Sequence, residues 1–237
     1  MITLAIDTSE ARGSVALLHD RGVVVRLHND ASDYSVWLLP AVNQVLSEAG
    51  SGIEQLQLLA VSTGPGSFTG LRVGLTTAKA WAEVYGTPIV GVSRLAAVAQ
   101  SQGTESPFVA ACYDAQRAQL FAALYRRASS GLERVGEELV VSPDDFVSLV
   151  NSEAGREPVC WISPDPELIR NSSTMSTRIA TGDQILASPA ELAITIARLA
   201  QQSAANGQFT DPLALDANYV RRSDAEIFWK GPASGVR

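Results

Sequence analysis

The chain has 237 residues, of which 46% are hydrophobic and 18% are charged, and its formal net charge is −7 at pH 7. This is an ordinary globular composition, with enough apolar side chains for a sizeable core. The negative charge gives no general attraction to phosphate backbones, so any action on a nucleic acid is expected to need a partner protein. No apolar run reaches the roughly 20 residues that span a bilayer, and the start lacks a basic signal-peptide region, so we expect a cytoplasmic location.

Three strands are expected at the start of the chain. Ile2–Asp7 is a short apolar run, and Gly13–Leu18 and Val23–Leu27 are rich in β-forming residues. Asp20-Arg21-Gly22 between the last two runs is typical of a turn. The second and third strands are therefore predicted to form an antiparallel hairpin.

Helices and strands then alternate. Apolar residues recur at helical spacing over Asp33–Ala49, Gly50 ends this helix, and Pro40 predicts either a kink or a later start. The next elements are expected to be strands at Leu56–Ser62 and Ile89–Val92, and helices at Thr69–Tyr85 and Ser93–Gln100.

A second set of elements partly repeats the first. The small, polar segment Gln102–Pro107 is the best domain boundary. Strands are expected after it at Phe108–Tyr113 and Gln119–Tyr125, and helices at Pro143–Asn151 and Ala190–Ala205. The order predicts two α/β lobes, each with a mixed sheet flanked by helices, as in the actin-like ATPase architecture. We divide the chain into a first lobe at 1–101, joined by 208–230, and a reduced second lobe at 102–207.

The glycine-rich segment Ser62–Gly74 is the strongest local signal, with glycines at 64, 66, 70 and 74. It follows an expected strand and opens an expected helix, whose free N–H groups could bind a phosphate. The spacing fits neither G-x-x-x-x-G-K-[ST] nor G-x-G-x-x-G. In the structural interpretation, the first two glycines form a tight turn, Ser67 or Thr69 caps the helix, and the last two leave one helix face bare. Close approach of another backbone would offset the cost of these helical glycines, so the spacing favours packing over chemistry.

Two other segments have open interpretations. Asp7-Thr8-Ser9 follows the first expected strand and is similar to the first phosphate loop of actin-like ATPases, but it lacks the usual glycine after the aspartate. A plain turn is the alternative. Asp114–Arg117 lies between two expected strands and is either part of a cleft between the lobes or a surface hairpin turn.

The sequence contains no recognised motif for a metal site or for a catalytic nucleophile. Cys112 and Cys160 belong to no CxxC motif and are expected to be buried free thiols. His19 and His28 lie at the ends of the expected hairpin, outside any HExxH motif, and no G-x-S-x-G nucleophile motif occurs. We therefore expect no metal, no cofactor and no catalytic residue.

Several segments in order carry a family resemblance. They are Ile6–Ser9 with Ser14–Leu17, Leu38–Pro40, Ser62–Gly74, Asp114–Arg117 leading into Phe121–Tyr125, and Tyr219-Val220-Arg221. Together they resemble the TsaB (YeaZ) family, the partner proteins in bacterial synthesis of N6-threonylcarbamoyladenosine on tRNA. The glycine-rich string is the most specific of these segments.

The resemblance implies an actin-like ATPase (ASKHA) fold with a reduced second lobe. It implies a non-catalytic assembly subunit that binds a TsaD-type catalytic subunit, joins a TsaE-type ATPase in a larger complex, and meets tRNA only through that complex. The first two helices would pack against those of the TsaD-type subunit, or of a second copy in a homodimer. Within them we expect the interface to use Leu39, Asn43, Leu46, Gly70, Val73, Gly74, Thr77, Ala80 and Trp81. Asp7, Thr8 and Ser9 would form a vestigial nucleotide site.

Two departures from the family pattern lower the expectation of independent nucleotide chemistry. Tyr34 stands where the family usually has a histidine, and Trp161–Asp165 lacks the glycine of a second phosphate turn. The Pro164 nitrogen also has no hydrogen to donate to a phosphate. Two alternatives stay open, namely an enzyme (a nucleotide-dependent transferase or a peptidase) and a simple homodimer.

Overall fold

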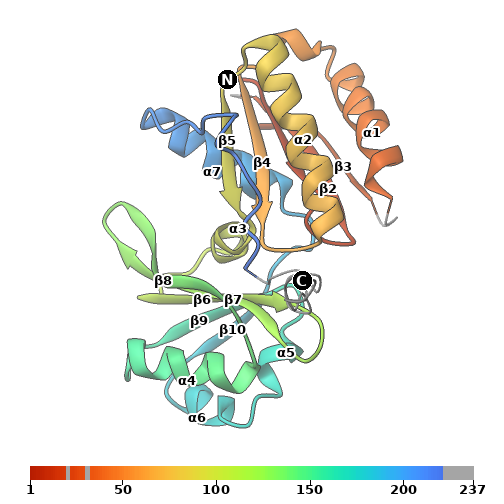
Figure 1. Ribbon diagram of the computed structural model, residues 1–237. Helices are drawn as coiled ribbons and strands as arrows, with labels where there is room; N and C mark the ends of the chain where they lie inside the picture. The colour runs from red at the N-terminus through yellow and green to blue at the C-terminus, as the bar shows by residue number, and fades with distance from the viewer. Residues whose placement is uncertain (20–21, 30–32, 221–237) are drawn as a thin grey trace, which may run out of the picture.

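The structure, a computed structural model, describes residues 1–19, 22–29 and 33–220, and of the side chains in 22–29 only that of Val23. Two five-stranded sheets form its framework, with strand orders β3-β2-β1-β4-β5 and β10-β9-β6-β7-β8 (Figure 1). Each sheet contains an antiparallel triplet, continued by two parallel strands. The two halves of the chain thus repeat one topology, which confirms the predicted pair of mixed sheets.

The strands of the first sheet are β1 (Thr3–Asp7), β2 (Gly13–His19), β3 (Gly22–Asn29), β4 (Leu58–Gly64) and β5 (Ile89–Ser93). Helices α1 (Tyr34–Glu48) and α2 (Phe68–Tyr85) lie side by side on one face of this sheet (Figure 1). A short 3-10 helix (Ile53–Gln55) precedes β4. Apolar side chains from both helices and the sheet form one core, including Leu38, Val42, Leu71, Leu75, Leu4 and Leu59. The alternation predicted for this half is confirmed.

Helix α1 begins at Tyr34, so Pro40 lies inside the helix and does not mark a later start. The Asp33 side chain caps it by accepting a 3.1 Å hydrogen bond from the Ser35 backbone N–H. The helix then runs through Pro40, whose side chain is exposed. The later start is therefore wrong, because the cap and the buried apolar face define the helix on both sides of the proline.

The second sheet consists of β6 (Phe108–Asp114), β7 (Leu120–Ala128), β8 (Gly131–Val141), β9 (Val159–Ser163) and β10 (Gln184–Ala187). Its outer face is covered by α4 (Pro143–Ala154), α5 (Glu167–Arg170) and α6 (Met175–Ala180). The core beneath these helices contains Phe146, Trp161 and Met175. The sequence patterns do not predict β8, β9, β10, α5 or α6. The prediction that Cys112 and Cys160 are buried free thiols is confirmed.

The last helix of each half lies between the two sheets. Helix α3 (Arg94–Gln100) packs on β6, β7 and β9 of the second sheet, whereas α7 (Ala193–Ala205) packs on β1, β2, β4 and β5 of the first. Both helices share one core with residues of both sheets. The predicted division at 102–207 therefore misplaces α7, because its buried face of Ala193, Ile196, Ala197 and Ala200 fits the first sheet.

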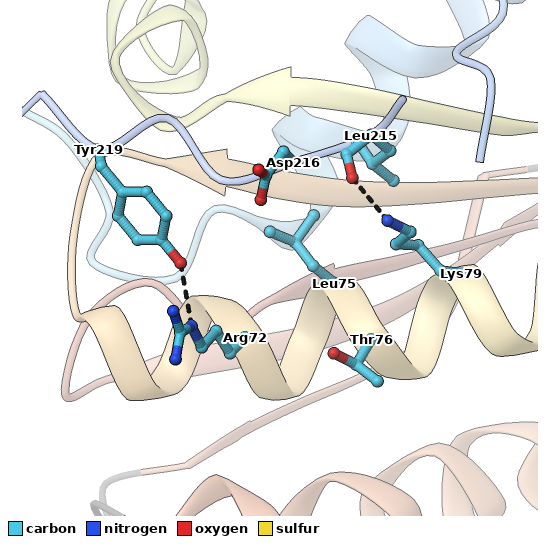
Figure 2. Close-up of a pocket in the computed structure, with 7 residues that line it drawn as sticks. All are labelled: Arg72, Leu75, Thr76, Lys79, Leu215, Asp216 and Tyr219. Atoms are coloured by element: carbon cyan, nitrogen blue, oxygen red, sulfur yellow. Dashed lines mark hydrogen bonds between the residues drawn. The ribbon is translucent and has the colours of Figure 1, made fainter. Parts of the chain in front are cut away.

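The segment after α7 returns to the first sheet. Thr210 pairs with Ile89, and the Asn218 backbone N–H donates to the Thr63 carbonyl at 2.7 Å. Between this segment and α2 lies a pocket of about 330 Å³, lined by Arg72, Leu75, Thr76, Lys79, Leu215, Asp216 and Tyr219 (Figure 2). The Lys79 ammonium donates to the Leu215 carbonyl and Arg72 Nε to the Tyr219 hydroxyl, at 2.8 and 3.2 Å. Residues 221–230 of the predicted 208–230 return lie outside the described part. Among the described residues, no helix is both long and apolar enough to cross a bilayer.

Candidate functional site

Polar and charged residues gather at the carboxyl ends of the parallel strands of the first sheet, a region that we call the strand-end site. Strands β1, β4 and β5 are parallel, and their carboxyl ends point toward the second lobe (Figure 1). Ligands of α/β proteins bind outside the carboxyl ends of such strands. The residues at these ends are Asp7 after β1, the glycine-rich segment after β4, and Arg94 after β5. The fold thus brings the predicted Asp7-Thr8-Ser9 segment together with a residue that the sequence patterns do not single out.

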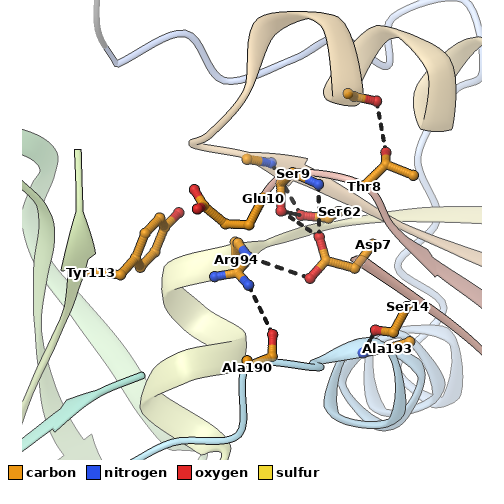
Figure 3. A network of polar contacts seen from close by, with 12 residues as sticks. Asp7, Thr8, Ser9, Glu10, Ser14, Ser62, Arg94, Tyr113, Ala190 and Ala193 are labelled. Atoms are coloured by element: carbon orange, nitrogen blue, oxygen red, sulfur yellow. Dashed lines mark hydrogen bonds and ion pairs between the residues drawn. The ribbon is translucent and has the colours of Figure 1, made fainter. Parts of the chain in front are cut away.

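Asp7 is fully buried at the end of β1. Its Oδ1 accepts hydrogen bonds from the backbone N–H of Ser9, at 3.1 Å, and from the Ser9 hydroxyl (Figure 3). Ser62, at the end of β4, donates its own hydroxyl to that of Ser9. One carboxylate oxygen is therefore used to hold the turn after β1, as in the plain-turn interpretation.

The other carboxylate oxygen of Asp7 faces Arg94. Arg94 Nε lies 3.3 Å from Asp7 Oδ2, and both side chains are at most 2% exposed. Burial by itself lowers the pKa of Arg94, but its interactions with Asp7, Tyr113 and Glu10 raise that pKa by more. The net shift is upward, so the guanidinium stays charged. A buried carboxylate needs such a partner because an uncompensated charge in the interior is costly. The strand-end site thus contains an internal ion pair at the position where the phosphate loop of an actin-like ATPase would have a free aspartate.

Glu10 lies at the mouth of this ion pair, on the turn between β1 and β2 (Figure 3). Burial raises its pKa to about 7, Arg94 opposes this rise, and the negative charges of Asp7 and Asp114 add to it. Its carboxyl group therefore gains or loses a proton close to neutral pH.

The Glu10 carboxyl group makes folding stability depend on pH. The folded protein holds this proton up to about pH 7, whereas the reference value is 4.5, so wild-type stability falls as pH rises between these values. Glu10→Gln cannot lose the proton. It is expected to equal wild type at pH 4, below the reference value, and to exceed it by about 1–2 kcal/mol at pH 8, because solvent reaches part of the group. Urea unfolding at both pH values measures this, with the exposed Glu153→Gln on α4 as control. A stability difference independent of pH would contradict it.

The glycine-rich segment packs against the turn after β1. A Cβ on Gly66 would lie 2.1 Å from the Ser9 carbonyl oxygen, and one on Gly70 would lie 2.1 Å from that of Thr8. The Ser67 N–H donates to the Ser9 carbonyl at 2.7 Å, and the Thr8 hydroxyl donates to the Gly70 carbonyl at 2.7 Å. The segment is thus filled by the protein's own backbone, which supports the packing interpretation over a phosphate cradle.

The prediction that Gly70 and Gly74 face a partner is wrong, because this side of α2 faces the turn after β1 of the same chain. Both glycines are buried, and a Cβ on Gly74 would lie 2.3 Å from the Thr8 hydroxyl. Their bare helix face therefore receives Thr8 of the same chain and is not available to a partner. The sequence signal for close backbone approach was sound, but local spacing does not say which backbone approaches.

Gly70→Ala is expected to lower the free energy of unfolding by about 2 kcal/mol or more, because the added methyl group overlaps the Thr8 carbonyl. Alanine would otherwise favour a helix by about 1 kcal/mol, so the sign of the change is decisive. Gly103→Ala is the matched control, since its methyl group meets nothing within 4 Å. Urea unfolding measures both variants, and a Gly70→Ala protein as stable as wild type would refute this packing.

Three further predicted segments have structural roles. The Tyr34 hydroxyl, at the start of α1, donates to the Glu10 carbonyl and fixes the turn after β1. Asp114 Oδ1 accepts the Gln116 N–H at 2.7 Å in the turn between β6 and β7, which favours the hairpin interpretation of Asp114–Arg117. After β9, the Ser163 hydroxyl and the Asp165 backbone bond to each other. This loop also satisfies its own polar groups.

The residues predicted for a partner interface divide by exposure. Leu39, Asn43 and Ala80 are exposed, whereas Val73, Thr77 and Trp81 are half-buried. Leu46 is only 6% exposed and belongs to the core under α1 and α2, so its inclusion is wrong. Sequence spacing missed Val36 and Val84, which are 69% and 73% exposed. We call the surface formed by Val36, Leu39, Asn43, Thr76, Ala80 and Val84 the α1–α2 face.

Two α/β halves with the same sheet topology define the class of this protein, the actin-like ATPase fold. Solved structures agree: the activator of 2-hydroxyisocaproyl-CoA dehydratase from Clostridium difficile, with bound ADPNP, is similar at a TM-score of 0.50 and 10% identity over 89% of this chain and 99% of that one. YeaZ from Pseudomonas aeruginosa is similar at a TM-score of 0.74 and 24% identity over 92% and 99% of the two chains. Both likenesses concern the fold.

Sequence comparison identifies the family. Residues 22–215 match the family model described as TsaD, tRNA N6-adenosine threonylcarbamoyltransferase. The tRNA threonylcarbamoyladenosine biosynthesis protein TsaB of Bacillus subtilis is 30% identical over 97% of this chain and 98% of its own length. The chain therefore belongs to the TsaB (YeaZ) family, which confirms the resemblance.

Proposed function

We propose that this protein is a non-catalytic assembly subunit of the complex that makes N6-threonylcarbamoyladenosine on tRNA. In this role it binds a TsaD-type catalytic subunit in the cytoplasm, supports a TsaE-type ATPase in a larger assembly, and meets tRNA through its partners. Membership of the TsaB family gives the pathway, and the net charge of −7 favours indirect contact with tRNA.

The single observation that carries this proposal is the α1–α2 face. Val36, Leu39 and Val84 each expose at least half of their side chain, although the same helices bury an apolar face on the sheet. Exposed large apolar side chains on two neighbouring helices favour an interaction site. Helix α2 also exposes the small residues Thr76 and Ala80, which permit close approach of a helix backbone. Two further helices could complete a bundle here.

The contacts made within the strand-end site support the proposed absence of catalysis. Asp7 is neutralised by Arg94, and the N–H of Ser67 and the carbonyls of Thr8 and Ser9 bond within the chain or meet its glycines. These groups are those that a phosphate or a metal ion would need. Purified protein that hydrolysed ATP or a peptide by itself, in an Asp7-dependent way, would favour an enzyme instead.

An association measurement tests the proposal. Isothermal titration of this chain with the TsaD-type subunit of the same organism, with and without ATP and Mg²⁺, is expected to give a one-to-one complex with a Kd in the micromolar range or below. No association when both proteins are present at about 10-fold above this micromolar range would reject the proposal. Light scattering of the chain alone over a concentration series shows whether the same face pairs two copies in the absence of the partner.

A further inference from the structure

Arg94 is the most unusual charged residue in the described part of the protein. It is the first residue of α3, directly after β5, and only 2% of it is exposed. A full positive charge is rarely buried unless it is paired.

Contacts from three different parts of the chain surround the Arg94 guanidinium (Figure 3). Its Nε lies 3.3 Å from Asp7 Oδ2 at the end of β1. Its Nη2 donates a 3.0 Å hydrogen bond to the Ala190 carbonyl, on the connection that leads to α7. Its carbon Cζ lies 4.9 Å from the centre of the Tyr113 ring on β6 of the second sheet. A carboxylate, a carbonyl and an aromatic face are all groups that attract a cation.

This environment differs from that of an ordinary structural arginine in the same protein. Arg178 directs all three guanidinium nitrogens to acceptors, namely Asp183 and the carbonyls of Gly155 and Glu157. Arg94, by contrast, has hydrogen-bond geometry at Nη2 alone, and its Nε and Nη1 are buried without a hydrogen-bond partner among the described residues. Asp7 Oδ2 is also without one. The surrounding groups therefore attract positive charge without accepting a hydrogen bond from every guanidinium nitrogen.

We propose that the groups around Arg94 form a cation-binding site whose cation is the Arg94 side chain, and that Arg94 thereby excludes a metal-bound nucleotide. The site lies at the carboxyl ends of β1, β4 and β5, where a ligand of this architecture is expected. Asp7 supplies the oxygen that a divalent cation would use. With the guanidinium in place, that oxygen is occupied, and the lobes are held by the ion pair without any ligand.

Chemical rescue tests whether Arg94 occupies a separable cation site. Arg94→Ala is expected to lower the Tm by at least 8 °C, because Asp7 stays buried without its counter-charge. Guanidinium chloride at 20 mM is expected to raise the Tm of this variant by 3 °C or more, although the same salt slightly lowers that of wild type. Sodium chloride at 20 mM is the ionic-strength control. Asp7→Asn/Arg94→Ala is expected to show no rescue, because the attracting charge is gone.

The outcomes decide the proposal in every case. A variant without loss of Tm, or a loss that guanidinium does not reverse, would overturn it. If Arg94→Ala does not fold, Asp7→Asn/Arg94→Met is expected to fold and to recover most of the Tm, and failure of this neutral pair would overturn the role of charge. A rise in the Tm of wild type with 5 mM Mg²⁺-ATP that disappears in Asp7→Asn would show that nucleotide binds at the strand-end site. This result would also overturn the proposal.

Discussion

Ala80→Arg is expected to weaken association with the TsaD-type subunit by at least about 100-fold, which corresponds to about 2.8 kcal/mol. Ala80 lies exposed on α2 and belongs to the α1–α2 face. A long charged side chain at the centre of a helix-to-helix contact separates the two backbones and loses its water. Because Ala80 points away from the core, the fold itself should be unaffected.

Ala205→Arg is the matched control for this experiment. Ala205 is also an exposed helical alanine, but it lies at the end of α7, on another part of the molecule. Isothermal titration is expected to give this control the wild-type Kd. Equal binding by Ala80→Arg and wild type would remove the α1–α2 face from the proposed interface. Gly74→Leu is unsuitable as a disrupting variant, since its side chain would collide with Thr8 inside the protein.

Asp183→Asn is expected to lower the free energy of unfolding by about 3–5 kcal/mol. The Asp183 carboxylate binds Arg178 through two hydrogen bonds of 2.7 and 3.0 Å. It also accepts the Trp161 indole N–H at 2.7 Å and the Val159 backbone N–H at 3.0 Å. The neutral amide leaves the buried Arg178 charge without its counter-charge and turns one acceptor into a donor. This network joins β9, α6 and the start of β10, so its loss affects the whole outer layer of the second lobe.

Glu167→Gln provides the control for the Asp183 network. Glu167 forms an ion pair with Arg170 at 3.1 Å on the nearby helix α5, but both side chains are more than half exposed. Exposed pairs of this kind contribute between zero and 1 kcal/mol. Urea unfolding is therefore expected to separate the two variants clearly. If Asp183→Asn unfolds at the same urea concentration as Glu167→Gln, the buried network does not hold the second lobe together.

Four of the elements missed by the sequence patterns, namely β8, β10, α5 and α6, share a physical cause. The fifth, β9, is fully buried but has only 5 residues. Strand β8 includes Glu133, Arg134 and Glu137, all exposed, and Gly136 at a positive φ of 72°. It is an edge strand, so few of its side chains need to be apolar. Helices α5 and α6 have only 4 and 6 residues, too few for a helical period to appear. Local pattern is therefore weakest where an element is short or half-solvated.

The sequence by itself determined the main plan of this protein. The hairpin, the buried strands, helices α1 and α2 and the partial repeat all depend on local turn residues and apolar spacing, and such signals lie within a few residues of each other. The family resemblance depends on a nearly continuous string, Ser62–Gly74, and was likewise readable without coordinates.

Only the tertiary structure decided what the distinctive residues touch. Arg94 meets Asp7 across 87 positions of sequence, and Thr8 meets Gly70 across 62, because parallel strands place their carboxyl ends at one edge. Spacing cannot reveal such contacts, nor which sheet receives α7, nor that Leu46 points inward while Leu39 points outward. These assignments depend on which buried surfaces fit together, and that fit is a property of the whole folded chain.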